Sequence, residues 1–187
     1  MAIEPDTKDW TWVLERPCDE CGFDTRTFAR ETTGDILRHL TLVWSRTLHT
    51  TPDAAARPRD DVWSPLEYGC HVRDVIRLYD QRLQLMLTED DPEYANWDQD
   101  ATAIADDYGA QDPATVADEI AAAGADLADR FDAVRDRAWQ RPGRRSDGAR
   151  FTVETFARYF LHDIVHHLHD VAPGEHGSEP RPESFQG

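Results

Sequence analysis

His162 and His166 stand four residues apart in the stretch 161–169, near the end of the chain. On a helix, this spacing places both imidazoles on one face, within reach of a single cation. A third histidine, His71, lies far upstream in a segment that also has the pattern of a helix. We therefore expect His71, His162 and His166 to bind one metal ion. Three protein ligands leave a coordination position open, as in catalytic rather than structural sites.

The residue types leave the metal and the outer ligands undecided, because neutral imidazole nitrogens suit zinc, nickel, cobalt and iron(II). A pair of histidines on a helix flank is more often exposed or hydrogen-bonded than metal-binding, but four histidines within eight residues favour a metal. His169 is a candidate substitute ligand, and Asp74 and Asp163 are candidates to orient the imidazoles. His167 should point about 100° away from His166, toward the apolar side of the helix.

Four amphipathic helices should position these side chains. Apolar residues recur at spacings of three and four in four segments, as the buried face of a helix requires. Ser64, Pro65 and Glu67 predict a capping box at the start of the second helix, and Asp112 and Thr152 cap the third and the last. The helices are expected at about 27–49, 65–87, 113–135 and 153–172.

The connections between the helices indicate the architecture. The acidic segment 88–111 has room for only a short helix, and it is long enough for the second and third helices to run parallel. Segment 139–150 reads as a loop, and no segment alternates as a strand would. We therefore predict an all-α four-helix bundle with long crossovers over 27–172. Residues 1–26 should form an irregular segment packed on the bundle, and residues 173–187 a disordered tail.

Composition narrows the class of protein. A formal charge of -17 over 187 residues favours solubility and argues against nucleic-acid binding, because an acidic surface repels phosphates. No apolar stretch approaches the roughly 20 residues that span a bilayer, and the first residues lack the pattern of a signal peptide. We therefore expect a cytoplasmic protein without a membrane partner.

The three cysteines do not suggest a disulfide framework. Cys18 and Cys21 form a C-x-x-C pair, but the second pair that a structural zinc site requires is not evident. We interpret this pair as a turn with buried or reactive thiols. Cys70, beside His71, should pack in the core.

Three motifs resemble the DinB-like superfamily over about residues 27–171. They are Trp63-Ser64-Pro65-x-Glu67, His71 about two turns later, and His162-x-x-x-His166-His167. The resemblance implies an up-down-down-up bundle with a metal held by His71, His162 and His166. The last motif is similar to the ligand-x-x-x-His-His run in the N-terminal domain of mycothiol-dependent maleylpyruvate isomerase, whose first ligand is Glu, and to the all-His version in bacillithiol-dependent transferases.

Thiol S-transfer is the function that this resemblance implies. A divalent metal, zinc or nickel, would deprotonate a thiol such as mycothiol, which would attack a small electrophilic substrate. Related bundles often pair as homodimers, although the sequence itself does not decide the oligomeric state. Arg144 and Arg145, in the basic loop before the last helix, are candidates to bind an anionic group, with ion pairing to surface carboxylates as the alternative. Trp97 is a candidate to line the cleft, with anchoring of its own loop as the alternative.

Two other functions compete with thiol transfer. A metal-dependent hydrolase of small molecules is the nearest, because His162 and His166 have the spacing of a zincin helix, although Asp163 stands where that motif has Glu. The other is a non-catalytic, metal-binding bundle associated with stress. Thiol-dependent loss of an electrophile, measured with and without metal, distinguishes the enzyme from the binding module.

Overall fold

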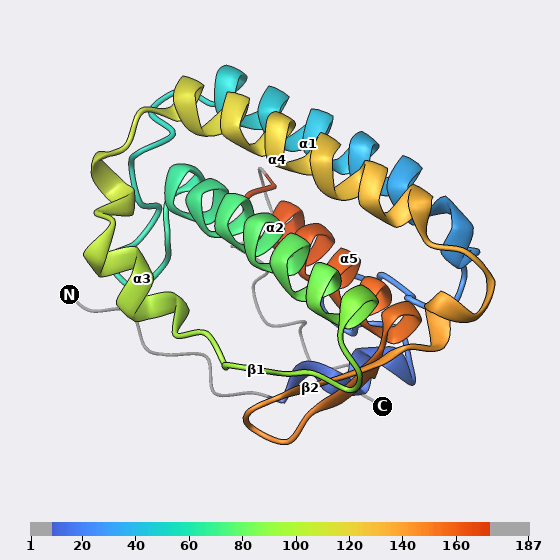
Figure 1. Cartoon of the computed structure of the whole chain (residues 1–187). Helices are drawn as coiled ribbons and strands as arrows, with labels where there is room; N and C mark the ends of the chain where they lie inside the picture. The colour runs from blue at the N-terminus through green and yellow to red at the C-terminus, as the bar shows by residue number, and fades with distance from the viewer. Residues whose placement is uncertain (1–8, 173–187) are drawn as a thin grey trace, which may run out of the picture.

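The computed structural model describes residues 9–172, which are mainly helical. Four long helices form a bundle, and a short helix lies in the crossover between the second and third of them (Figure 1). The tail expected at 173–187 lies outside the described residues, as do residues 1–8. Within 9–172, no helix has the length and apolar character needed to cross a membrane. The α-helices are α1 (Thr33–Thr50), α2 (Pro65–Thr88), α3 (Gln99–Ala105), α4 (Pro113–Ala133) and α5 (Val153–Asp170).

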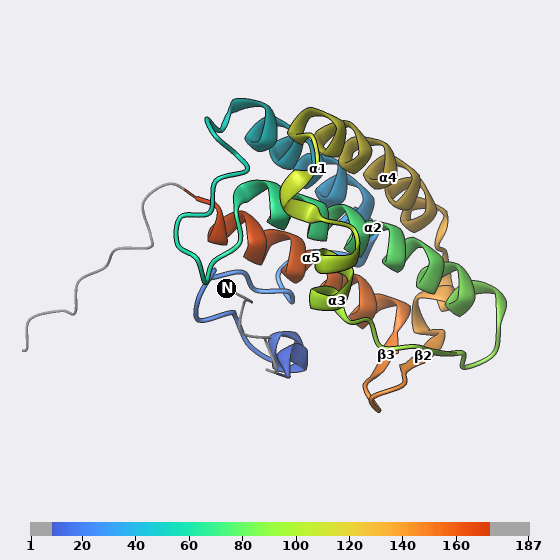
Figure 2. The same cartoon turned by 90° about the vertical axis from the view of Figure 1, so that its left-hand side faces the viewer.

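The expected up-down-down-up topology is confirmed. In Figure 1, α1 and α5 run in one direction, and α2 and α4 run in the other. The long segment between α2 and α4 returns the chain to the same end of the bundle, which lets these two helices run parallel. α1 packs mainly against α4, and α2 contacts both α4 and α5. Figure 2 shows the N-terminal segment, drawn in blue, on the side of α5 that faces away from α1 and α4.

α1 begins at Thr33, later than the predicted start near Thr27. Before it, Arg30–Thr32 forms a short 3-10 helix. The hydroxyl of Thr27 donates to the Asp24 carbonyl (2.8 Å), and that of Thr32 donates to the Ala29 carbonyl (2.7 Å). Such local side-chain bonds give the backbone an alternative to the helix, so the apolar spacing before Thr33 does not extend it.

The prediction that no segment forms strands is wrong. The segment read as a loop before α5 is a β-hairpin, and a third strand from the crossover pairs with it in parallel. Gly143 is needed there, because a Cβ at this position would lie 2.7 Å from Met86 Cγ. Strands this short contain too few residues for alternation to show in the sequence. The strands are β1 (Glu93–Tyr94), β2 (Pro142–Arg145) and β3 (Arg150–Thr152).

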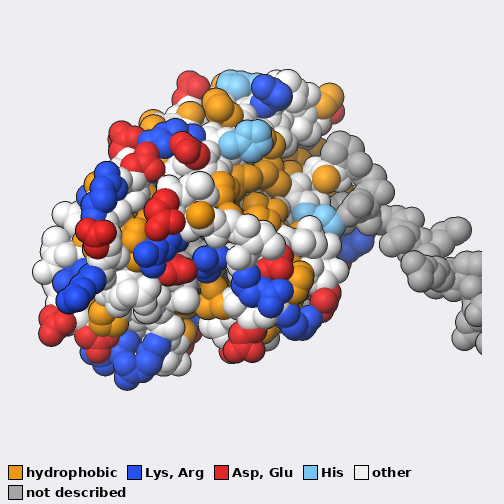
Figure 3. Space-filling model, turned by 90° about the vertical axis from the view of Figure 1, so that its right-hand side faces the viewer, with side chains coloured by type: hydrophobic (Ala, Val, Ile, Leu, Met, Phe, Trp, Pro, Cys, Tyr) orange, Lys and Arg blue, Asp and Glu red, His pale blue; other side chains and the backbone are white. Residues whose placement is uncertain are grey.

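Charges of both signs are interspersed on the face shown in Figure 3, despite the net charge of -17. Arginines pair with nearby carboxylates, as Arg38 does with Asp132 at 2.7 Å and Arg130 with Asp80 at 2.5 Å. This face therefore presents no continuous basic surface.

The close approach of α1 and α4 depends on Gly124. A Cβ at this position would lie 2.3 Å from Thr41 Cγ2, inside van der Waals contact. Gly124→Val should therefore destabilise the fold by about 2–3 kcal/mol, as overpacking a close contact does. Urea unfolding measures the loss, and Ala122→Val on the exposed face of the same helix is the matched control. Equal stability of the two variants would contradict this packing.

The cap at the start of α2 fixes the helix that carries His71. Ser64 Oγ accepts from the Glu67 N–H (3.2 Å), and the Glu67 carboxylate accepts from the Ser64 N–H (2.8 Å), which confirms the expected capping box. Arg57 Nε donates to the same carboxylate at 2.8 Å. Burial alone would raise the pKa of Glu67, but the hydrogen bonds from Arg57 and Ser64 outweigh it and hold the pKa below its usual value.

Replacing Glu67 with glutamine should destabilise the fold by about 2 kcal/mol at neutral pH. A carboxyl whose pKa is lowered by folding stabilises the fold above its unfolded pKa, and this contribution is lost as the pH falls through the folded pKa. The difference in the free energy of unfolding between Glu67→Gln and wild type should therefore become smaller below the ordinary glutamate pKa of 4.5. Urea unfolding across this pH range measures it, with exposed Glu15→Gln as the control. A difference that does not change with pH would contradict the assignment.

Candidate metal centre

A cavity of about 770 Å³ lies between α2, α5 and the residues that lead into α3. The N-terminal segment contributes Trp10 and Glu20 to its wall. All three histidines expected as ligands line the cavity. Together with two further residues of α5, they are His71, His162, Asp163, His166 and His167.

Three of these side chains converge and could hold one metal ion. His71, Asp163 and His167, the His-Asp-His group, each offer a ligand atom within 4.8 Å of the others. Asp163 Oδ2 lies 3.7 Å from His71 Nε2, and Asp163 Oδ1 lies 3.5 Å from His167 Nε2. Two ligands about 2.1 Å from one tetrahedral ion are about 3.4 Å apart, so these spacings fit a shared ion. One helical turn separates Asp163 from His167, and α2 places His71 opposite them.

His71 is the clearest sign that the His-Asp-His group suits a cation. Sequence patterning places this side chain at the rim of its helix, whereas the structure leaves it only 2% exposed. Among the described residues, neither ring nitrogen of His71 has a hydrogen-bond partner. A buried polar atom without a partner costs about 1–3 kcal/mol, which a metal bond would offset. Burial lowers the pKa of His71 and so favours the neutral imidazole that a metal requires.

A second carboxylate orients His167. His167 Nδ1 and Asp170 Oδ2 are 2.8 Å apart, which leaves Nε2 facing Asp163. Metal-binding imidazoles are usually oriented by such a carboxylate. Burial would lower the pKa of His167, but Asp163 and Asp170 raise it to about 9. Burial likewise favours neutral Asp163, but His167 and His71 hold its pKa below the usual range. The two carboxylates thus stabilise the protonated, positively charged ring of His167. A metal ion bound there would displace that proton.

His162 and His166 belong to a different group. Together with Cys18 and Cys21 they form the Cys-His group, whose ligand atoms also lie within 4.8 Å of one another. Burial lowers the pKa of His162 to about 4 and lowers the pKa of His166 as well. Both imidazoles are therefore neutral near pH 7.

The ligand set expected from the sequence is thus split between two groups. The structure brings His162 and His166 together, but it pairs His71 with Asp163 and His167. Successive helical positions point about 100° apart, so the two i, i+4 pairs of α5 face different neighbours. His167 does turn away from His166, as expected, and its ring contacts that of His71 edge-on at 4.7 Å between centroids.

Two other expected roles fall elsewhere. Asp74 accepts hydrogen bonds from the Tyr108 hydroxyl (2.5 Å) and from Arg73 Nε (2.8 Å), and the carboxylate that orients an imidazole of the His-Asp-His group is Asp170. His169 is in neither group of candidate ligands among the described residues.

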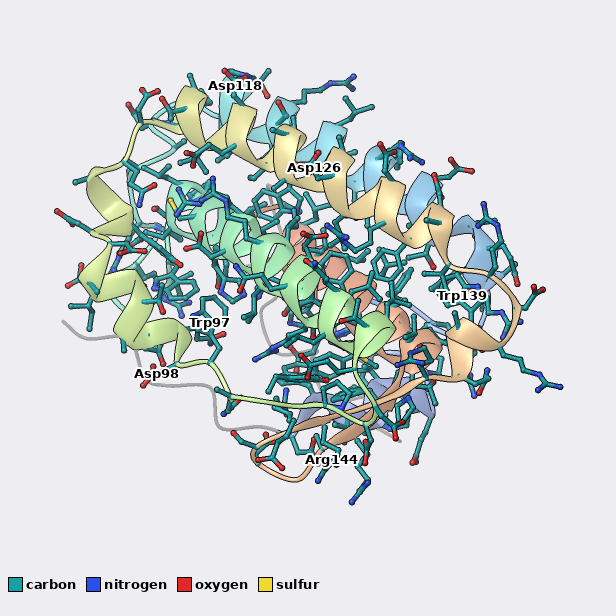
Figure 4. The ribbon with its side chains drawn as sticks, in the orientation of Figure 1. Trp97, Asp98, Asp118, Asp126, Trp139 and Arg144 are labelled. Carbon is teal, nitrogen blue, oxygen red and sulfur yellow. The ribbon has the colours of Figure 1, made fainter. Side chains whose placement is uncertain are left out.

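The candidate substrate residues also divide. Trp97 and Arg145 line the cavity, and the Trp97 ring stacks on that of His71 with 5.4 Å between centroids and 17° between planes. Figure 4 shows Trp97 beside α2 and Arg144 at the lower edge of the view, in β2. Arg144 pairs with Asp91 (3.1 Å) and Glu93 (3.5 Å), as the surface alternative predicts.

Sequence reasoning missed Arg82, a buried cation in the cavity wall. Its Nη2 donates to the Ala95 carbonyl (2.6 Å), and its guanidinium carbon lies 4.8 Å from the centre of the Tyr94 ring. Within the described range its Nε has no hydrogen-bond partner, and no carboxylate pairs with it. Burial lowers the pKa of Arg82, although the group stays charged at neutral pH. The signal in the sequence is an arginine three residues after Tyr79 and four after Leu78, within the apolar face of α2.

Long helices in up-down-down-up order, with a histidine-lined cavity beside α2 and α5, define a mainly helical bundle with a candidate metal centre. A sequence model of the DinB superfamily matches residues 6–171, and the chain therefore belongs to the DinB superfamily.

Among solved structures, the chain is similar to YfiT from Bacillus subtilis, reported as a probable metal-dependent hydrolase with an unusual four-helix bundle topology. The TM-score is 0.69 at 18% sequence identity, over 77% of this chain and 86% of that one. At this identity the likeness shows the fold. No curated protein matches the chain in sequence.

Proposed function

We propose that this chain is a divalent-metal-dependent thiol S-transferase that acts on small electrophiles, with zinc or nickel held by His71, Asp163 and His167. The observation that carries the proposal is the buried His71 ring, whose nitrogens have no hydrogen-bond partner among the described residues, at the point where the three ligand atoms converge. The two proposed ligands on α5, Asp163 and His167, each lie one residue after the ligands expected from the sequence, His162 and His166.

The side chains around the His-Asp-His group suit this chemistry. A divalent ion with three protein ligands keeps an open position at which a thiol or a water loses its proton near neutral pH. Asp170 fixes the ring of His167, and Trp97 covers one face of His71. The cavity volume of about 770 Å³ lies within the usual range for small-molecule sites, so it has room for a mycothiol-type thiol and a small electrophile.

Thiol transfer is favoured over hydrolysis because the two carboxylates nearest the His-Asp-His group already have roles other than that of a general base. A thiol that coordinates a divalent ion is deprotonated outright and needs no separate base. Hydrolysis benefits from a positioned general base. Asp163 serves here as a candidate ligand, and Asp170 is engaged with His167. Hydrolysis remains the second candidate, because YfiT is reported as a probable metal-dependent hydrolase.

One pair of assays tests the proposed function. The full chain loaded with zinc or nickel should consume monobromobimane in the presence of mycothiol or cysteine, and it should lose this activity when the metal is removed. Cleavage of p-nitrophenyl acetate without a thiol would overturn the proposal and support a hydrolase. Metal binding with neither thiol transfer nor ester cleavage would support the non-catalytic binding module.

Arg82 should bind an anionic group of the thiol or the electrophile. Replacing it with methionine should raise KM for cysteine about 10–100-fold, the worth of a charge-assisted hydrogen bond. The KM for cysteamine, which lacks the carboxylate, should change little. Arg144→Met is the matched control, because Arg144 pairs with surface carboxylates. If the ratio of the KM for cysteine to the KM for cysteamine is the same in Arg82→Met as in wild type, this role is contradicted.

A small molecule is the proposed partner, since the cavity between α2, α5 and the residues leading into α3 has the volume of a small-molecule site. Pairing as a homodimer stays a prediction, which sedimentation equilibrium of the full chain measures.

A further inference from the structure

The Cys-His group combines two spacings that metal sites use. Cys18 and Cys21 have two residues between them, and His162 and His166 have three. Structural zinc sites with two cysteines and two histidines use both spacings. The cysteine pair has no second pair nearby in the sequence, and the fold supplies one from α5, more than a hundred residues away.

A tight turn holds the two cysteines together. The Gly22 N–H donates to the Cys18 carbonyl, and the Cys18 N–H donates to the Phe23 carbonyl, both at 2.9 Å. Gly22 has a φ of 73°, a left-handed conformation that glycine adopts without strain. The turn therefore closes on itself and presents both cysteines to the same region of α5.

The histidines meet this turn in a buried position. Cys18 is 2% exposed, His162 is 3% exposed and His166 is 8% exposed. Cys18 Sγ lies 3.7 Å from His166 Nδ1, close to the roughly 3.6 Å expected between a sulfur and a nitrogen on one tetrahedral zinc ion. Within residues 9–172, His162 Nε2 is buried and has no hydrogen-bond partner. The Trp10 ring covers both imidazoles, at 5.6 and 4.9 Å between centroids.

We propose that Cys18, Cys21, His162 and His166 bind a second, structural divalent ion of the zinc type. Binding releases one proton from each thiol, so that two thiolates and two neutral imidazoles balance the charge of the dication. Four protein ligands leave no open position, which distinguishes this site from the His-Asp-His group. A disulfide or a redox pair would account for the cysteines, but it would leave the buried His162 nitrogen without a partner.

The second ion has a mechanical role in this arrangement. It joins the N-terminal segment to the turn of α5 that also carries Asp163 and His167. Figure 2 shows this segment on the face of α5 opposite the rest of the bundle, where Trp10 packs on His162 and His166 and Arg158 donates to the Phe28 carbonyl. The structural ion therefore adds a cross-link between this segment and α5, beside the ligand pair of the His-Asp-His group.

Cobalt substitution of the full chain tests this proposal. Thiolate ligands give Co(II) an intense charge-transfer absorption in the near ultraviolet, which the sulfur-free His-Asp-His group cannot produce. We expect this band in wild type and in Asp163→Asn, and its weakening in Cys21→Ser, which removes one of the two thiolates. Cys70→Ala is the matched control, because Cys70 is buried in the core, where its thiol faces the Tyr108 carbonyl. Absence of the band from wild type, or its full wild-type intensity in Cys21→Ser, would overturn the proposal.

Alkylation of the wild-type chain gives a second test that requires no variant. With zinc bound, Cys18 and Cys21 should react with iodoacetamide about tenfold more slowly than after chelation, because the metal holds the nucleophilic thiolates. Equal rates, or an intact mass that shows a Cys18–Cys21 disulfide, would overturn the proposal. The cobalt band without S-transferase activity would refute the proposed function alone, and activity without the band would refute the second ion alone.

Discussion

Asp163→Asn is expected to lose the ion of the His-Asp-His group and, with it, the S-transferase activity. The substitution keeps the size of the side chain but removes the negative charge that lies between His71 and His167. Outer carboxylates alone change metal affinity about 10–100-fold, so loss of a direct ligand should weaken binding by more than about 100-fold. Isothermal titration with zinc and the monobromobimane assay measure the two effects.

The neighbouring position provides the sharpest comparison for Asp163→Asn. His162→Gln should lose the ion of the Cys-His group and keep the ion of the His-Asp-His group. Asp126→Asn, on the exposed face of α4 (Figure 4), is the charge-matched control and should retain both ions. Wild-type zinc affinity at both sites in Asp163→Asn would refute its role as a ligand.

Removing metal from the protein should lower its stability as well as its activity. An ion that joins Cys18 and Cys21 to α5 closes a loop of more than a hundred residues, and a cross-link of that span stabilises a fold by about 4 kcal/mol. For a chain of this size, the loss corresponds to roughly 10 °C in Tm. Calorimetry before and after dialysis against a strong chelator measures the shift, and added zinc should restore it.

Variants assign this shift to one of the two sites. Cys21→Ser should already have the lower Tm and should respond little to the chelator. Asp163→Asn should keep most of the wild-type response. A chelator shift of the same size in wild type and Cys21→Ser would contradict a structural role for the Cys-His group.

Local chemistry predicted most of the fold. The capping box of Ser64 and Glu67 fixes the start of α2, and the cap residues Asp112 and Thr152 fix the starts of α4 and α5, because each satisfies free backbone N–H groups within one turn. The short strands were not predictable, since their pairing joins the crossover to a hairpin about fifty residues further on.

The candidate site required information that lies outside the sequence pattern. The spacing of four residues is shared by His162 with His166 and by Asp163 with His167, and about 100° separates these pairs. Only the packing of α5 against α2 decides which pair faces His71. The sequence did contain a clue, because His167 lies toward the apolar side of the helix, where a neighbouring helix must pack.

The cysteine pair shows the same dependence on tertiary structure. A C-x-x-C pair alone does not indicate a structural metal site, because two of the four ligands are missing. The partners come from the face of α5 that points away from the bundle, and the N-terminal segment covers that face. His162 and His166 are therefore buried by a segment that no periodicity in α5 could reveal.

Anomalous diffraction from crystals of the zinc-loaded full chain tests the central claim, that adjacent residue pairs of α5 serve two different sites. Data collected above and below the zinc edge should show one peak bounded by His71, Asp163 and His167, and a second bounded by Cys18, Cys21, His162 and His166. A single peak bounded by His71, His162 and His166 would contradict the claim.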